Sequence, residues 1–217
     1  MLLVAVALGA AVTYPAGYLE GITFGAMDDS SPSFAVIAVI AAIYEEIAKL
    51  LIVVAIALTV PKKFNDPLDG IIYGSMVGLG MAVAESIDYT RGLQSGTSLP
   101  PAEVVRLVGH LVMSGIAGFA IGMARMKMAN WFRTLVGCLL VAIAMHFLWD
   151  WAALSQAGEI SWPQTLTGML LMLGGCLFYG VLVIVGSDWS RKIFAPHGKL
   201  SLWGWPFALR NAAHDER

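Results

Sequence analysis

The chain has 217 residues, a formal net charge of -2, 58% hydrophobic residues and only 13% charged residues. A soluble domain carries about 25% charged residues, so this composition excludes an ordinary soluble domain and indicates an integral membrane protein. The negative net charge argues against nucleic-acid binding. The length leaves room for about six spans of roughly 20 residues. We therefore expect an all-α, multi-pass transmembrane helical bundle in one domain, residues 1–217.

Apolar runs and turn residues predict the spans in chain order. The first, Leu2–Leu19, is expected to be a retained helix, because no basic segment precedes it. An acidic connection, Glu20–Ser33, follows, and Ser30-Ser31-Pro32 is typical of a helix start. The other spans are expected at Phe34–Val60, which Pro61-Lys62-Lys63 ends, and at Asp69–Tyr89, Ala102–Met126, Trp131–Leu154 and Gln164–Gly186.

The basic residues predict the orientation, because they concentrate on the cytoplasmic side of membrane proteins. Six spans put alternate connections on opposite sides. Both termini are therefore predicted to be cytoplasmic in a cell-membrane protein, and the tail 187–217 to lie at the membrane surface. Arg106, near the outer end of the fourth span, is an exception. One side holds Lys62, Lys63, Arg125, Lys127, Arg133 and the basic, Trp-rich tail, and the other holds Glu20, Asp28, Asp29, Arg91 and Glu159.

Three charged side chains lie inside the second span: Glu45, Glu46 and Lys49. On a helix the lysine lies one turn beyond both carboxylates and can pair with either. Because it neutralises only one of them, the other must take up a proton or find a metal, a histidine or water. Charges inside a membrane mark function by default; the alternative is a purely structural ion pair.

Further ionisable residues lie in the next three spans: Glu85 in the third, His110 in the fourth, and His146 with Asp150 in the fifth. His146 and Asp150 share a helix face, so the carboxylate can fix the imidazole tautomer. At about 1.5 Å per residue, Glu85 and both histidines lie roughly 10 Å inside the outer ends of their spans, and Glu45 lies at roughly 16 Å. A common cavity in the outer half of the membrane is therefore expected. A lone histidine in a membrane helix is more often a hydrogen-bonded packing residue, which is the alternative for His110, whereas the pairing of His146 with Asp150 favours function.

Other conspicuous residues are expected to serve packing. Cys138 and Cys176 lie in apolar segments without metal-ligand spacing, so we interpret them as small buried hydrophobes. The third and fourth spans also carry glycines at spacings that allow close helix contact. These are Gly74, Gly78, Gly115, Gly118 and Gly122.

Three motifs resemble those of the PrsW family of intramembrane proteases. Residues 45–49 (EEIAK) resemble its EExxK motif, and residues 146–150 (HFLWD) its HxxxD motif. Residues 81–85 (MAVAE) are similar to its FxxxE motif, with methionine in place of phenylalanine. His110 lies where such proteins have a histidine at the start of a span. The resemblance covers about 34–155, and the rest of the chain is matched only in hydropathy.

The resemblance implies a helical fold related to the prenyl-protein (CAAX) endopeptidases and the bacteriocin-immunity-type membrane proteases. It implies that the chain, held in membrane lipid, cleaves a membrane-tethered protein near its external face. For PrsW-like members that substrate is a transmembrane anti-sigma factor, and the cut is the first of a signalling cascade. The expected outer-half depths agree with attack from that side.

The expected mechanism uses Glu45 or Glu46 as general base on a water molecule, with Lys49 paired to the other carboxylate. In the metal-free version, histidine donors stabilise the oxyanion. In the metal version, a zinc ion is bound by three ligands and water. No compact HExxH-type spacing is present, and the metal-free version is preferred. The oxyanion donors would be His110 and His146 backed by Asp150, and the zinc ligands Glu85, His110 and His146.

Two functions of other classes remain open. Intramembrane carboxylates and histidines also suit a proton-coupled transporter, although no paired Gly/Pro-broken helices occur in corresponding halves. A non-catalytic membrane scaffold related to the proteases would tolerate Glu45→Gln, Glu46→Gln and His146→Ala with its function intact. Cleavage of a single-pass substrate by these variants separates the three functions.

Overall fold

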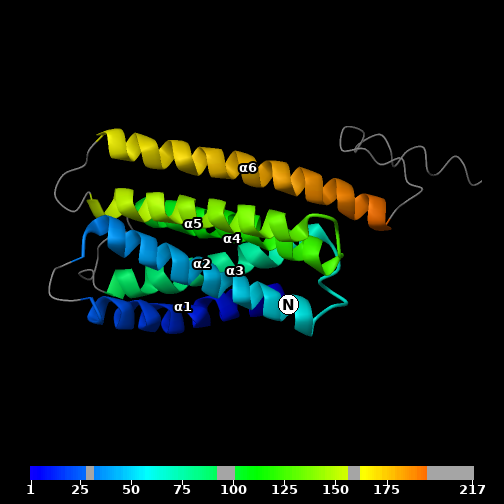
Figure 1. Cartoon of the computed structure of the whole chain (residues 1–217), viewed down its shortest axis with the longest axis horizontal. Helices are drawn as coiled ribbons and strands as arrows, with labels where there is room; N and C mark the ends of the chain where they lie inside the picture. The colour runs from blue at the N-terminus through cyan, green and yellow to red at the C-terminus, as the bar shows by residue number, and fades with distance from the viewer. Residues whose placement is uncertain (28–31, 92–100, 156–161, 195–217) are drawn as a thin grey trace, which may run out of the picture.

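The structure, a computed structural model, describes residues 1–27, 32–91, 101–155 and 162–194, and these residues form α-helices without any strand. The helices lie side by side, and the chain reverses between successive helices, so the N-terminus and the end of α6 lie toward the same end of the bundle (Figure 1). The predicted all-α multi-pass bundle is confirmed. Its helices are α1 (Leu2–Gly25), α2 (Phe34–Thr59), α3 (Pro67–Arg91), α4 (Pro101–Arg125), α5 (Trp131–Ser155) and α6 (Trp162–Phe194).

Five of the helices, all except α2, are long and apolar enough to cross a membrane. The remaining helix, α2, has 26 residues and carries Glu45, Glu46 and Lys49 near its middle. Its outward face is apolar, since Leu51 and Leu58 are exposed. The charges of α2 therefore need partners inside the bundle, and the chain is an integral membrane protein.

The centre of the bundle is the pair α3 and α4, which are the most deeply buried helices and make the most extensive helix contact. Glycines allow this contact. A Cβ atom added at Gly74 would collide with the backbone carbonyl of Ser114, and one added at Gly118 would collide with that of Gly70. The backbones therefore touch, and the predicted small-residue faces serve packing between α3 and α4.

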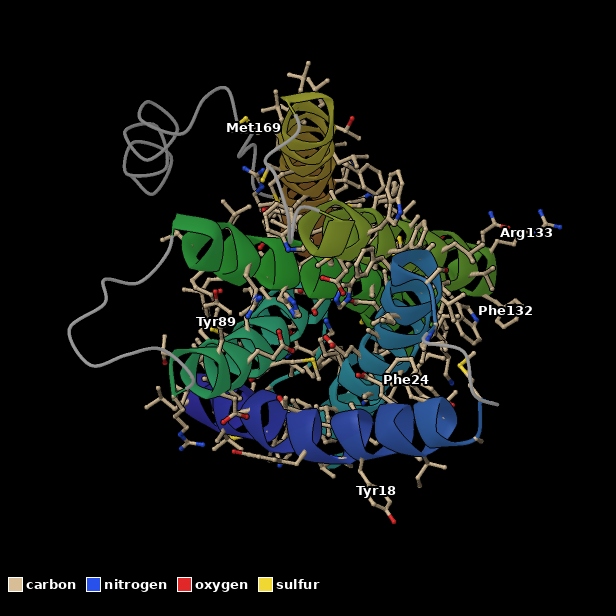
Figure 2. The ribbon with its side chains drawn as sticks, turned by 90° about the vertical axis from the view of Figure 1, so that its left-hand side faces the viewer. Tyr18, Phe24, Tyr89, Phe132, Arg133 and Met169 are labelled. Atoms are coloured by element: carbon tan, nitrogen blue, oxygen red, sulfur yellow. The ribbon has the colours of Figure 1, made fainter. Side chains whose placement is uncertain are left out.

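The other helices cover this pair. α1 packs against α3 and α2, while α5 packs against α4 and α2. α6 lies outside α3, α4 and α5. Seen end-on, α1 and α6 lie on opposite sides of the bundle, with the remaining helices between them (Figure 2). This arrangement encloses one region between α2, α3, α4 and α5.

α1 is longer than predicted. It continues to Gly25, whereas the sequence analysis ended it at Leu19, so Glu20 lies in a helix and not in the predicted acidic connection. The charge of Glu20 lowers the local hydropathy, but no proline follows before Pro32 to end the helix. The helix also contains Pro15, which membrane helices tolerate. Outside the described residues lie the predicted loop acids Asp28, Asp29 and Glu159.

α6 is also longer than predicted. It continues to Phe194, beyond the predicted end at Gly186. The polar residues after Gly186 lower the hydropathy of this segment, but they contact the rest of the bundle: the Ser190 hydroxyl donates to Asp66 Oδ2 at 2.6 Å. Hydropathy records only the loss of apolar residues, so it could not show this contact. The rest of the predicted tail, residues 195–217 with its tryptophans, lies outside the described residues.

Candidate active site

The ionisable residues of four helices meet in the enclosed region. α2 contributes Glu45, Glu46 and Lys49, α3 contributes Glu85, α4 contributes His110, and α5 contributes His146 and Asp150. All seven candidates from the sequence therefore come together. The sequence predicted that these residues lie at a similar depth. The structure shows in addition that the helix faces that carry them point toward one another.

The deepest layer is a hydrogen-bonded network around Glu46. Lys49 Nζ donates to Glu46 Oε1 at 2.6 Å, and His146 Nδ1 contacts the same oxygen at 2.9 Å. Lys49 Nζ also lies 3.1 Å from His110 Nδ1. Glu46, Lys49 and His146 are each 1% exposed. A buried charge is tolerated only with such partners. Glu46 Oε1 is therefore occupied by its contacts with Lys49 and His146.

The network also fixes the protons on the two imidazoles. An ammonium group has donors only, so His110 Nδ1 must accept from Lys49 and the ring must carry its proton on Nε2. An ionised carboxylate has acceptors only, so His146 Nδ1 must donate to Glu46. The two rings contact each other edge to face, with 4.9 Å between their centroids.

Glu45 is held differently from its neighbour. Its Oε2 lies 3.6 Å from His146 Nε2, 3.9 Å from Lys49 Nζ and 4.0 Å from His110 Nδ1. These distances exceed those of hydrogen bonds, and this buried oxygen has no hydrogen-bond partner among the described residues. Polar groups at such separations are often bridged by water. Glu46 Oε2 and Glu85 Oε1 also have no hydrogen-bond partner in the described part of the chain, but Glu45 Oε2 is the one that lies within 4.0 Å of both histidines, and the Glu45 side chain is 15% exposed.

Each histidine has a further carboxylate beside it. Glu85 Oε2 lies 3.4 Å from His110 Nε2, and Asp150 Oδ2 lies 3.2 Å from His146 Nε2. Both carboxylates are partly exposed. They orient the imidazoles, and Asp150 also stabilises positive charge on His146.

Three side chains of the site offer ligand atoms of the kind that bind a divalent metal ion. Ligand atoms of Glu45, His110 and His146 all lie within 4.8 Å of one another. The predicted metal set contained Glu85 in place of Glu45, but Glu85 is not part of this group and lies against His110, at 3.4 Å. Two imidazoles and one carboxylate are the ligands of a common type of catalytic zinc site, which leaves one position open. The number and kind of these donors, and the unpartnered Glu45 oxygen, fit a divalent ion.

Glu20 of α1 is a site neighbour that the sequence analysis missed. Its carboxylate interacts electrostatically with Glu45, His146 and Asp150. One turn farther along α1, the Thr23 hydroxyl lies 3.0 Å from that of Tyr44, which precedes Glu45. The lack of a helix-ending residue after Leu19 was the only signal that α1 would reach this level.

The fold and the site together define a multi-pass membrane protein with a buried cluster of carboxylates and histidines between its helices. Comparison with known proteins gives the family. The model described as "PrsW family intramembrane metalloprotease" matches residues 1–185, so the chain belongs to the PrsW family. The resemblance noted in the sequence is thus confirmed.

A curated relative supports this assignment. "Protease PrsW" of Geobacillus kaustophilus (strain HTA426) is 30% identical over 94 residues, which are 43% of this chain and 41% of the relative. The match thus spans less than half the length of that protein. No solved structure matches the chain.

Proposed function

We propose that the chain is an intramembrane endopeptidase that hydrolyses a peptide bond of a membrane-tethered protein, with Glu45 as the general base. One observation carries this proposal. The unpartnered Glu45 Oε2 lies 3.6 Å from His146 Nε2 and 4.0 Å from His110 Nδ1, with no direct hydrogen bond to either. A water molecule held there would have an acceptor for its proton and polar groups around it.

The chemistry is that of general acid–base hydrolysis. Glu45 accepts a proton from water as the water oxygen attacks the scissile carbonyl carbon, and it returns the proton to the leaving amine when the C–N bond breaks. His146 in its protonated form donates from Nε2 to the oxyanion. Asp150, whose Oδ2 lies 3.2 Å from this nitrogen, stabilises the positive charge of the imidazolium. No proton or electron is left over at the end of the cycle.

The buried network keeps these groups in place. Glu46 accepts hydrogen bonds from both Lys49 and His146. It therefore keeps a proton on His146 Nδ1 and holds the lysine ammonium in position. A site held by such contacts needs little reorganisation when charge develops on the substrate. Glu46 therefore serves as an orienting residue in this proposal, and Glu45 as the reactive one.

A metal ion would be held by Glu45, His110 and His146. When bound, it would polarise the scissile carbonyl and lower the pKa of its bound water. The metal-free arrangement is favoured here because the Lys49 ammonium already lies 3.1 Å from His110 Nδ1 and 3.9 Å from Glu45 Oε2. A second cation would have to compete with it for the same two atoms.

We further propose that the substrate is a single-pass membrane protein of the anti-sigma-factor type, cut from the external side, and that both termini of this chain are cytoplasmic. The basic connections support this orientation, since those between α2 and α3 and between α4 and α5 lie at one end of the bundle (Figure 1). Lys62 and Lys127 lie in them. Glu85 and His110 lie nearer the other end of their helices. Reporter fusions at the two termini test the orientation.

The decisive experiment places the purified protein in lipid vesicles with a single-pass transmembrane test substrate. We expect a new fragment with the wild type, and its loss with Glu45→Gln and His146→Ala. Asp188→Asn is the matched control, because Asp188 forms an exposed pair with Lys192 in α6. Cleavage by Glu45→Gln at the wild-type rate would overturn the proposal.

Chelator treatment then separates the two roles of Glu45. A free general base gives cleavage that is unchanged by a chelator. Loss of cleavage that zinc restores would instead make Glu45 a metal ligand. A wild type that binds the test substrate without cutting it would support the scaffold alternative.

A further inference from the structure

A second polar group lies at the outer end of the α3–α4 interface, outside the motifs. Its centre is Glu103, which is only 2% exposed. The Ser86 hydroxyl of α3 donates to Glu103 Oε2 at 2.6 Å, and Arg106 Nη1 lies 3.2 Å from the same oxygen. One carboxylate oxygen thus joins the two helices and holds a cation.

This group adjoins the candidate active site. Ser86 follows Glu85 in α3, and Arg106 precedes His110 by one turn of α4. Glu85 Oε2 and His110 Nε2 are 3.4 Å apart. Their contact therefore lies at the same α3–α4 interface as the Glu103 group, nearer the middle of the two helices. Arg106 also interacts electrostatically with both of these residues.

On the inner side of the Glu85–His110 contact, the backbones of α3 and α4 touch. A Cβ atom added at Gly78 of α3 would collide with the carbonyl oxygen of His110. The helices therefore cannot separate or slide there without losing close packing. On the outer side Arg106 is held twice, by Glu103 and by the ring of Tyr89, whose centroid is 5.7 Å from the guanidinium carbon. The Glu85–His110 contact lies between these two restraints.

Packing alone does not explain a carboxylate at this place. Burying an ion pair costs several kcal/mol in desolvation, and replacing such a pair by apolar residues is often neutral or stabilising. An apolar residue at 103 would leave Ser86 without its acceptor and Arg106 without its counter-ion. What the carboxylate adds is a fixed geometry of α3 and α4.

We propose that Glu103 is a positioning residue for the reaction: through Ser86 and Arg106 it holds the outer ends of α3 and α4 so that Glu85 and His110 keep their contact beside Glu45. This inference rests on the proposed hydrolytic function. It assigns no contact with substrate to Glu103, whose effect passes through the two helices.

The test uses Glu103→Gln in the full chain, in vesicles with the single-pass test substrate. The amide keeps the shape and an acceptor for Ser86 but loses the charge that holds Arg106. We expect kcat to fall about tenfold or more, as when groups that orient an active site are removed, with KM and thermal unfolding unchanged. The matched control is Asp88→Asn, which removes a carboxylate paired with Arg91 on the exposed surface of α3.

Arg106 provides the second variant. Arg106→Gln is expected to lower kcat as much as Glu103→Gln, the double variant no further than either, and Arg106→Lys is expected to recover part of the loss. A kcat of Glu103→Gln equal to that of Asp88→Asn would overturn the proposal. So would a fall in kcat that follows the thermal stability of the variants, since this would mean a purely structural role.

A readout independent of cleavage keeps this inference separate from the proposed function. Spin labels at the exposed positions Ile87 in α3 and Val104 in α4 report the distance between the outer ends of the helices. We expect a broader distance distribution in Glu103→Gln and no change in Asp88→Asn. An unchanged distribution in Glu103→Gln would overturn the positioning role, whereas full cleavage by Glu45→Gln would overturn the hydrolytic function alone.

Discussion

The two halves of the α3–α4 pair, called inner for the half near Pro67 and Arg125 and outer for the half near Arg91 and Pro101, differ in the residues that form the contact. In the inner half, Gly70 and Gly74 lie against Gly118 and Ser114, and the two backbones touch. In the outer half the interface is filled by ionisable side chains, among them Glu85 and the residues around Glu103. The comparison shows what each half does. Small residues set the distance between the helices, and that distance decides how closely the polar side chains beyond them can approach one another.

The largest effect is expected at Glu45 of α2, which faces His110 in the outer half of the α3–α4 pair. Glu45→Gln keeps the size of the side chain and removes its ability to accept a proton, so cleavage should fall by about 10²–10⁴-fold, the usual contribution of a general base. Initial rates of fragment release measure this loss. A fall of less than about threefold would show that another group takes the proton.

The next effect is on stability, at Lys49. Lys49→Met leaves the buried Glu46 carboxylate without its cation, and removing one partner of a buried pair costs about 3–5 kcal/mol. Reversible unfolding in mixed micelles measures the change. Adding Glu46→Gln should recover much of it, because the double variant has no uncompensated charge. Independent, additive losses would mean that the 2.6 Å contact contributes little.

The inner half should respond to a single methyl group. Gly118→Ala places a Cβ against the carbonyl of Gly70, so the helices must move apart at a cost of about 1–3 kcal/mol. Cleavage should fall as well, because the outer contacts depend on the same spacing. The control is Gly137→Ala in α5, where a Cβ meets nothing within 4 Å. Equal stability of the two variants would contradict the backbone contact.

The smallest effect belongs to the exposed end of α6. Asp188 and Lys192 are 2.6 Å apart, with side chains 47% and 71% exposed. Exposed pairs contribute about 0–1 kcal/mol, so Lys192→Met should leave both unfolding and cleavage nearly unchanged. A large loss in either would show that this end of α6 has a role that its contacts do not reveal.

Much of this arrangement could be predicted from the sequence, because the relevant signals are local. Apolar runs predicted all six helix starts to within two residues, and helical spacing placed Lys49 one turn from both carboxylates. The difference between Glu45 and Glu46 could not be predicted in this way. The two residues are adjacent, and only the positions of His110 and His146 on other helices distinguish the proposed base, Glu45, from the proposed orienting residue, Glu46.

Other misses have the same origin. Glu20 and Glu103 are single acids near the ends of spans: the predicted first span ended before Glu20, and Glu103 lay inside the predicted fourth span with no role assigned to it. The groups that attract them, His146 for the first and Ser86 for the second, lie on other helices. Hydropathy averages over one segment, so it cannot show that a neighbouring helix compensates the charge.

The three charges of α2 also bear on how the protein enters the membrane. Fourteen of its residues are Leu, Ile, Val or Phe, and together they favour insertion by roughly 4 to 8 kcal/mol, while three charged residues near the middle oppose it by roughly 8 to 10 kcal/mol. On these figures the free energy of inserting α2 into the membrane as an isolated helix is not favourable. It becomes a stable span when helices made later in synthesis supply its partners, so biogenesis and assembly of the active site are one event.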